Sequence, residues 1–286
     1  MTILVTGATG QLGRLVLDAL ARRTHPASLA ASVRDPGKAA AIAADGIEVR
    51  QGDFDHPDTL ARTFAGVDTL LIVSGDAPID VRIRQHRNAV DAALAAGVGR
   101  VVYTSFVDPR PESHFPFATI HADTEGYLKA SGLPYTILRN GVYADNLAGF
   151  IGRAIGSGTL AAPAGDGRVA FVSRADLAEA TATVLLDDGH AGRTVELSGP
   201  AAVDFGAVAD AVARRIGKSI VYQPITDAAF TGGLAQAGLP PFMVSALSGL
   251  FRAVADDAYA VTSTETGELA GRTIEDLDAF LARTLG

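Results

Sequence analysis

A glycine-rich segment near the N-terminus has the composition and spacing of a phosphate-binding loop. Its glycines recur at every third position in Gly7-Ala8-Thr9-Gly10-Gln11-Leu12-Gly13, directly after the apolar run 2–6. In such a loop one glycine permits a tight turn, one lets the backbone approach a pyrophosphate, and one lets the helix pack against the strand. The following helix presents free N–H groups and the positive end of its dipole to phosphate. This context predicts a dinucleotide site rather than a ligand-free turn, with contacts from Gly7, Thr9, Gly10, Gln11 and Leu12.

The residues after the second apolar run decide which dinucleotide the loop would take. An acidic residue at this point binds the ribose hydroxyls and favours NAD, but here Arg34 comes first and Asp35 second. The guanidinium of Arg34 suits a 2′-phosphate, and Lys38 lies one helical turn further along. Hydrogen bonds to charged groups contribute about 1.5–3 kcal/mol, so this pair predicts a preference for NADPH. The alternative leaves Arg34 in solvent, with Asp35 accepting the ribose.

Another polar and aromatic pair, Asp53 and Phe54, follows the third apolar run at 47–51. Asp53 is a candidate acceptor for the adenine amino group, and Phe54 is a candidate to pack beside the adenine ring. Equally, the two residues can serve as a capping residue and a core aromatic. The sequence leaves both interpretations open.

Several common catalytic groups are absent from the chain. It has no cysteine, which excludes disulfides, thiolate nucleophiles, iron–sulfur clusters and cysteine-ligated zinc. It contains neither a Gly-x-Ser-x-Gly elbow nor a His-Glu-x-x-His motif, and we expect no metal site. None of its six tyrosines is followed four residues later by one of its three lysines, since Lys129 comes only two residues after Tyr127. The Tyr-x-x-x-Lys pair that many dehydrogenases use as a proton donor is therefore missing.

The elements that must position these residues alternate in type along the first half of the chain. Short apolar runs without strict alternation predict buried parallel strands at 2–6, 29–33, 47–51, 69–73, 100–104 and 135–138. Apolar residues at helical spacing predict helices at 11–23, 36–45, 57–65, 79–96 and around 121–130. This rhythm predicts an α/β fold of the Rossmann type, a doubly wound parallel sheet with helices on both faces.

The rhythm loosens after residue 139. We expect helices at 174–186 and 205–216 and strands at 194–197 and 219–223, the first of which could rejoin the main sheet. From residue 226 onward the pattern is mainly helical. The predicted division is a dinucleotide-binding domain of residues 1–140, joined by about 168–197, and a smaller, mostly helical substrate domain of 141–167 and 198–286.

Composition and charge limit the partners of the chain. Its 286 residues are 48% hydrophobic and 20% charged, with a net charge of −8. This composition is globular, and the negative balance argues against nucleic acid as the main partner. The uncharged stretch 228–251 is broken by glycines and by Pro240-Pro241, so it predicts two short helices and no membrane span. Without a basic, apolar leader we expect a cytoplasmic protein, in which the apolar segment 242–251 is a candidate lid or homodimer interface.

A set of short motifs extends along nearly the whole chain. Besides the glycine loop, it comprises Val33-Arg34-Asp35-Pro36, Gln85-His86-Arg87-Asn88, Tyr103-Thr104-Ser105, His121 through Glu125, the run from Tyr135 to Tyr143, and Ala164-Gly165-Asp166-Gly167. The glycine loop is shared widely, whereas the combination is much more specific. With this combination the chain resembles the NmrA-like, atypical short-chain dehydrogenases/reductases. Within them it looks most like the type 2 NAD(P)H:quinone oxidoreductases, with triphenylmethane dye reductases as close relatives.

The resemblance implies NADPH on the glycine loop, with Arg34 at its phosphate end, and a substrate cleft between the two domains. It implies that the ends of three strands border the nicotinamide and the substrate. That placement agrees with ligand binding at the carboxyl ends of parallel strands. The implied residues are Ser74, Gly75, Thr104 and Ser105 for the cofactor, and Phe106, Asn140, Gly141 and Tyr143 for an aromatic substrate such as a quinone.

Reduction of a quinone is compatible with the missing proton donor. A quinone is already an electrophile, so a hydride can reach it without a strong acid, and solvent or a weak donor can protonate the product. His121 and Tyr143 are the candidate catalytic residues, since either could hydrogen-bond the developing oxyanion. Alternatively, His121 only holds the nicotinamide ribose or a neighbouring helix, and Tyr143 only walls the cleft. We expect His86 and Asn88 to be packing polar residues between helix and sheet.

Three functions remain open at this point. The first is NADPH-dependent reduction of a quinone or a similar conjugated acceptor. The second is a regulatory, NmrA-like redox sensor that binds NADP(H) and a protein partner without turnover. The third is reduction of a triphenylmethane or azo dye. The missing proton-donor pair fits the first two, and the run Asn140–Tyr143 favours reduction of a small molecule.

Overall fold

One parallel sheet of seven strands organises the computed structural model, which describes all of residues 1–286. Its strands are β1 (Ile3–Val5), β2 (Leu29–Val33), β3 (Glu48–Gln51), β4 (Thr69–Ile72), β5 (Arg100–Phe106), β6 (Tyr135–Asn140) and β9 (Thr194–Leu197). Their order across the sheet is β3-β2-β1-β4-β5-β6-β9. The direction of winding reverses between β1 and β4, where such sheets open a crevice for ligands. The expected α/β, Rossmann-type fold is confirmed, including the return of 194–197 to the main sheet.

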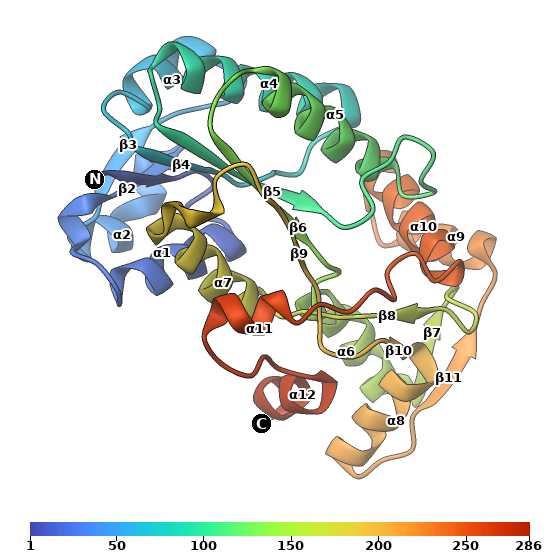
Figure 1. Cartoon of the computed structure of the whole chain (residues 1–286). Coiled ribbons are helices and arrows are strands. Elements are labelled where there is room, and N and C mark those ends of the chain that lie inside the picture. The colour runs from blue at the N-terminus through green and yellow to red at the C-terminus, as the bar shows by residue number, and fades with distance from the viewer.

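Helices cover both faces of this sheet (Figure 1). One layer contains α3 (Pro57–Thr63), α4 (Ile79–Ala95) and α5 (Pro116–Ala130). The other contains α1 (Gln11–Ala21), α2 (Ala40–Ala44), α7 (Arg174–Leu186) and α11 (Glu265–Ala270). Strands β1, β2 and β4 are buried along their whole length because both of their faces are covered. This explains why their sequences are apolar without alternation.

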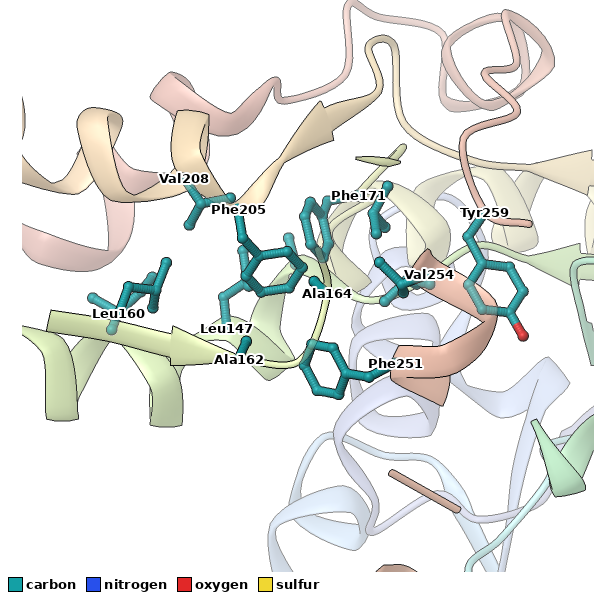
Figure 2. Close-up of a cluster of buried hydrophobic side chains, with 14 of the residues drawn as sticks. Leu147, Leu160, Ala162, Ala164, Phe171, Phe205, Val208, Phe251, Val254 and Tyr259 are labelled. Atoms are coloured by element: carbon teal, nitrogen blue, oxygen red, sulfur yellow. The ribbon is translucent and has the colours of Figure 1, made fainter. Parts of the chain in front are cut away.

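A second core lies in the later part of the chain. It is built from α6 (Ala148–Ser157), β7 (Thr159–Ala162), β8 (Arg168–Val169), β10 (Val203–Asp204), α8 (Phe205–Ile216), β11 (Val221–Pro224), α9 (Asp227–Gln236), α10 (Pro241–Ala255) and α12 (Leu277–Leu285). Figure 2 shows the centre of this core, where Phe171, Phe205 and Phe251 pack together and the hydroxyl of Tyr259 points away from the cluster. Because buried residues from Val107 to Ile120 join the same cluster, packing does not separate at residue 140. The division into two domains stays a prediction.

Several elements differ from the sequence-based expectation. Strands β7, β8 and β10 were not predicted, and each has only two to four residues outside the main sheet. The expected strand 219–223 begins at Val221 and pairs with β7 outside the main sheet. The expected helix 36–45 divides into a 3-10 turn, Pro36–Ala39, and the short α2, and α5 begins at Pro116, before the expected start near 121.

Helices α9 and α10 flank the turn at Gly238–Pro240, as the uncharged stretch 228–251 predicts. Phe251 and Val254 of α10 are buried in the second core, so much of the helix's apolar surface packs within the chain. A lid or homodimer role for this segment stays a prediction. None of the helices combines the length and the apolar character that a membrane span requires.

Candidate active site

The glycine loop connects β1 to α1 at the point where the sheet changes its winding direction. Gly7 has φ of +60°, which favours glycine, and its carbonyl accepts a hydrogen bond of 2.9 Å from the Gly10 N–H. A Cβ atom on Gly13 would lie only 2.3 Å from the Gly7 oxygen, so α1 can approach the loop this closely only with glycine there. Both features are those that a tight turn beneath a pyrophosphate needs.

The first turn of α1 has no internal partner for its N–H groups. Gly10 is the N-cap, no side chain caps the helix, and no acidic residue lies in its first turn. Gly7, Thr9, Gly10 and Gln11 are exposed, whereas Leu12 is buried. Free donors and an unopposed helix dipole attract phosphate, so these residues fit the pyrophosphate of a dinucleotide.

Arg34 and Lys38 provide free positive charge at the end of the neighbouring strand β2. Both side chains are exposed, and neither belongs to any ion pair of the chain. The carboxylate of Asp35 instead accepts a hydrogen bond of 3.0 Å from the Gly37 N–H and caps the turn that follows. This capping bond gives Asp35 a structural role, and the two cations fit a phosphate on the ribose.

Asp53 and Phe54 have structural partners of their own. The Asp53 carboxylate accepts a hydrogen bond of 3.0 Å from the Asp55 N–H. Phe54 packs partly buried against the core under α3 and α4, and its carbonyl accepts a hydrogen bond of 2.8 Å from the Asn88 amide. Asn88, expected to be a packing residue, therefore anchors this loop to α4. Both residues remain next to the strand ends where an adenine would lie.

Hydroxyl groups tie the ends of β4 and β5 to each other and to α5. The Ser74 N–H donates to Oγ1 of Thr104 at 3.0 Å, and the Ser105 hydroxyl donates to Glu125 at 2.7 Å. Thr104 and Ser105 are buried, Ser74 is partly buried and Gly75 is exposed. The Thr104 and Ser105 side chains thus brace the ends of β4 and β5 from inside the fold. The backbone of Gly75 is exposed at the same strand ends.

A line of hydrogen-bonded polar side chains lies between the sheet and helices α4 and α5. Arg82 donates from Nη2 to the Ser74 hydroxyl at 2.7 Å, and this hydroxyl lies 3.1 Å from Nε2 of His86. The Tyr103 hydroxyl lies 3.4 Å from Nδ1 of His86 and 2.8 Å from Nδ1 of His121. We refer to Arg82, Ser74, His86 and Tyr103 as the buried chain. Sequence reasoning missed Arg82, named Tyr103 only as part of a family motif, and treated His86 only as a packing residue.

Burial and one positive charge keep both histidines neutral. Burial, together with the charge of Arg82, lowers the pKa of His86 to about 3. Burial, Arg82 and His86 hold the pKa of His121 well below its ordinary value of 6.5. Arg82 is only 5% exposed, forms no ion pair, and has no partner for Nε or Nη1, while its guanidinium lies 4.7 Å from the centre of the Phe117 ring. It is an uncompensated buried cation.

Asn140 ends β6, and Tyr143 follows it three residues later. The Tyr143 hydroxyl accepts a hydrogen bond of 3.3 Å from the Asn140 amide, and the Arg174 guanidinium lies 4.4 Å from the centre of its ring. Burial raises the pKa of Tyr143, so its phenol keeps its proton. The charge of Arg82 lowers the pKa of His121 and works against the rise in the pKa of Tyr143.

The predicted substrate residues divide between two places. The Phe106 ring packs 6.1 Å from the His121 ring and 5.2 Å from the Tyr259 ring, measured between centres. A cavity of about 440 Å³ lies beyond β6 and β9, and its lining includes Gly141, Arg139 and Tyr259 but not Phe106, Asn140 or Tyr143. Phe106 therefore lies beside His121, whereas Gly141 lines a separate cavity.

Glu125 joins three elements below the site through a buried ion pair. It is 3% exposed and accepts two hydrogen bonds from Arg139, at 2.8 and 2.9 Å, besides the bond from Ser105. Burial acts to raise the pKa of Glu125, but Arg139 and Ser105 outweigh it and the net pKa is lowered. No group of three or more possible metal ligands occurs in the structure.

Comparison with known proteins places the chain in a family. The model of the NmrA-like family matches residues 1–281. The chain belongs to this NmrA-like family. Among its NmrA-like relatives, Quinone oxidoreductase 2 of Escherichia coli K12 is 39% identical over 246 residues, which are 86% of this chain and 85% of the relative.

Two solved structures share almost the entire fold of this NmrA-like chain. An NADPH-dependent quinone oxidoreductase from Escherichia coli, complexed with NADPH, superposes with a TM-score of 0.95 at 35% identity and covers 100% of both chains. The triphenylmethane reductase of Citrobacter sp., complexed with NADP(H), gives a TM-score of 0.93 at 34% identity over 99% of each chain. The predicted family is therefore confirmed.

We expect Glu125→Gln to lower the free energy of unfolding by about 2–3 kcal/mol at pH 7. The substitution removes the buried carboxylate and leaves Arg139 only its contact of 3.5 Å with Glu196. The loss stays at or below the roughly 3–5 kcal/mol that a broken buried ion pair costs, because Arg139 is partly solvated. The folded-state pKa of Glu125 is lowered from its ordinary value of 4.5, so its stabilising effect exists above that pH and fades below it. Urea unfolding between about pH 7 and pH 4 measures the difference.

The exposed, unpaired Glu112 offers a matched control, and Glu112→Gln should change stability by less than about 0.5 kcal/mol. Equal effects of the two substitutions, or a Glu125→Gln effect that grows as the pH falls, would contradict the role of the ion pair.

Proposed function

We propose that this chain is an NADPH-dependent reductase that transfers a hydride to a quinone or a similar conjugated acceptor. The observation that carries the proposal is the pairing of a free glycine-loop helix terminus with two unpaired cations, Arg34 and Lys38, while Asp35 is engaged in a cap. Relatives that resemble the chain over nearly its full length are described as a quinone oxidoreductase with NADPH and a triphenylmethane reductase with NADP(H).

The cofactor contacts that we propose follow the strand ends. The loop from Gly7 to Leu12 holds the pyrophosphate through its backbone N–H groups. Arg34 and Lys38 hold the 2′-phosphate, and Asp53 with Phe54 borders the adenine. The remaining contacts come from the ends of β4 and β5 and border the nicotinamide: Ser74, Gly75, Thr104 and Ser105.

Bound NADPH supplies a hydride, and the chain itself orients the acceptor and stabilises the oxygen that gains charge. His121 offers Nε2, the ring nitrogen that has no partner in the chain, and Tyr143 offers its protonated phenol. Hydrogen bonds of this kind stabilise a developing oxyanion. The substrate wall that we propose comprises Phe106, Asn140 and Tyr143, whereas Gly141 lines the separate cavity beyond β6. A cytoplasmic location and a homodimer remain predictions from the sequence.

The proposed function is tested by mixing purified protein with NADPH and a panel of small quinones, and following the loss of nicotinamide absorbance. A triphenylmethane dye belongs in the same panel, because a reductase of such dyes shares the fold at a TM-score of 0.93. We expect NADPH oxidation that depends on a quinone. Tight NADPH binding without reduction of any acceptor would contradict the proposal and favour a sensor that binds the cofactor without turnover.

Arg34→Ala should weaken NADPH binding about ten- to a hundredfold, because charge-assisted hydrogen bonds contribute about 1.5–3 kcal/mol. NADH, which lacks the 2′-phosphate, should bind within about twofold of its original affinity. Fluorescence titration of both nucleotides measures the two effects. Arg62→Ala removes another exposed, unpaired arginine on α3 and should change neither affinity. Equal losses for NADPH and NADH after Arg34→Ala would refute the phosphate role.

His121→Ala should lower turnover at saturating NADPH about ten- to a hundredfold, since it removes a donor to the oxyanion. Tyr143→Phe should also lower turnover, because it removes the other protonated group offered to the oxyanion. The exposed His56 provides the control, and His56→Ala should leave turnover unchanged. If neither His121→Ala nor Tyr143→Phe changes turnover, the protein only positions its two ligands.

A further inference from the structure

The hydrogen bonds of the buried chain determine where each proton resides. Arg82 can only donate, so the Ser74 oxygen accepts its bond of 2.7 Å. The Ser74 hydroxyl proton then has one acceptor, Nε2 of His86 at 3.1 Å. Because the pKa of His86 is about 3, the imidazole is neutral and carries one proton. With Nε2 accepting, that proton lies on Nδ1.

The other side of His86 leads independently to the same assignment. Its Nδ1 lies 2.8 Å from Oγ1 of Thr124, and the Thr124 hydroxyl donates to the carbonyl of Ile120 at 2.8 Å. A hydroxyl has a single proton, so Oγ1 must accept from Nδ1 of His86. Two separate sets of partners thus place the His86 proton on Nδ1.

The assignment extends from His86 to His121 through Tyr103. The Tyr103 hydroxyl lies 3.4 Å from Nδ1 of His86 and 2.8 Å from Nδ1 of His121, and the hydroxyls of Thr124 and Ser74 also act on its pKa. Since Nδ1 of His86 carries a proton, Nδ1 of His121 is the one ring nitrogen to which the phenol can donate, and it is the partner at 2.8 Å. Burial raises the pKa of Tyr103, so the phenol has its proton to give. Nδ1 of His121 is therefore an acceptor, and the single proton of this neutral ring lies on Nε2.

Arg82 gives the series of hydrogen bonds its direction. Three bonds of the buried chain point away from this cation: Arg82 donates to Ser74, Ser74 to His86, and Tyr103 to His121. Between them, the Nδ1 proton of His86 faces Thr124 at 2.8 Å and the Tyr103 oxygen at 3.4 Å. A fixed charge polarises the hydrogen bonds that start from it. No carboxylate pairs with the guanidinium, and its charge opposes protonation of both histidines. His121 consequently acts as a donor without becoming an imidazolium.

We propose that the buried chain is a positioning device that fixes His121 as a neutral hydrogen-bond donor, with its proton on Nε2. This role deepens the proposed function, on which it rests for its use in catalysis, because Nε2 is the atom offered to the acceptor oxygen. His121 is 5% exposed. Its Nε2 has no partner in the chain and is not fully enclosed. Tyr103 and His86 do not touch the acceptor and act through His121.

The tautomers are measured directly by nitrogen NMR of the full chain labelled in its histidine rings, with and without NADP. We expect both signals to be neutral at pH 6, with His86 protonated on Nδ1 and His121 on Nε2. Substitution of each histidine by glutamine assigns its signal. A His86 proton on Nε2, a His121 proton on Nδ1, or titration of His121 near its ordinary pKa of 6.5 would overturn the proposal. This measurement does not require turnover, so its outcome is independent of the outcome of the quinone assay.

The substitution Tyr103→Phe tests the hydrogen bond from Tyr103 to His121. Tyr103→Phe keeps the fully buried ring but removes the donor to Nδ1, so the His121 signal should show a mixture of tautomers. Turnover with a quinone should fall about tenfold while NADPH affinity stays within about twofold. Tyr127→Phe is the matched control, because its hydroxyl bonds to Asp91 at 2.7 Å outside the buried chain and should affect neither reading.

Identical His121 spectra in the Tyr103→Phe and original proteins would overturn the assignment of Tyr103 as the donor. A thermal unfolding scan accompanies both variants, and His86→Gln provides a second break in the chain at a different residue. If His86→Gln folds and leaves the His121 proton wholly on Nε2, the inferred connection through His86 is wrong.

Discussion

The parallel register of β4, β5 and β6 decides where the polar groups of the candidate site emerge. Ile72 pairs with Tyr103, and Tyr103 with Ile137, so the three strands end at one edge. Side chains alternate along a strand, and Tyr103 accordingly faces α4 and α5 while Val102 faces the core around α1 and α7. A slip of one residue would exchange these faces and remove Tyr103 from both histidines. The hydrogen bonds that orient His121 therefore depend on the pairing of the sheet.

Two buried charged groups in this layer differ in whether they have a partner of opposite charge. The carboxylate of Glu125 accepts a bidentate pair of hydrogen bonds from Arg139 and a further bond from Ser105. These bonds connect α5 to β5 and β6. Arg82 has no carboxylate partner and leaves two donor nitrogens unpaired. An unpaired buried charge costs stability, so this arrangement weakens the fold compared with a paired arginine. The charge is useful where negative charge develops nearby, which supports a functional role for Arg82 and a structural one for Glu125.

Local pattern was sufficient to predict most of the fold. Helices Arg174–Leu186 and Phe205–Ile216 and strand Leu29–Val33 coincide with their predicted ranges, because each is bounded by caps or turns that the sequence shows. The two-residue strands β8 and β10 carry no periodicity that a pattern could reveal. Likewise the glycine loop was recognisable because its residues are contiguous. The buried chain was not, because its partners are separated by eight to eighteen residues and meet only after α4 and α5 pack on the sheet.

The same geometry bears on the missing Tyr-x-x-x-Lys pair, because a different cation and a different donor occupy this site. A lysine beside a tyrosine favours the ionised phenol. Here burial raises the pKa of both Tyr103 and Tyr143 in spite of Arg82, and both phenols keep their protons. The positive charge acts instead through hydrogen bonds on a neutral imidazole, whose N–H is a weak acid. Such a donor is adequate for an acceptor that is already electrophilic and only needs its new charge stabilised. A ketone, which needs a proton as it takes the hydride, would find no suitable acid, so this site favours quinones over alcohol–ketone chemistry.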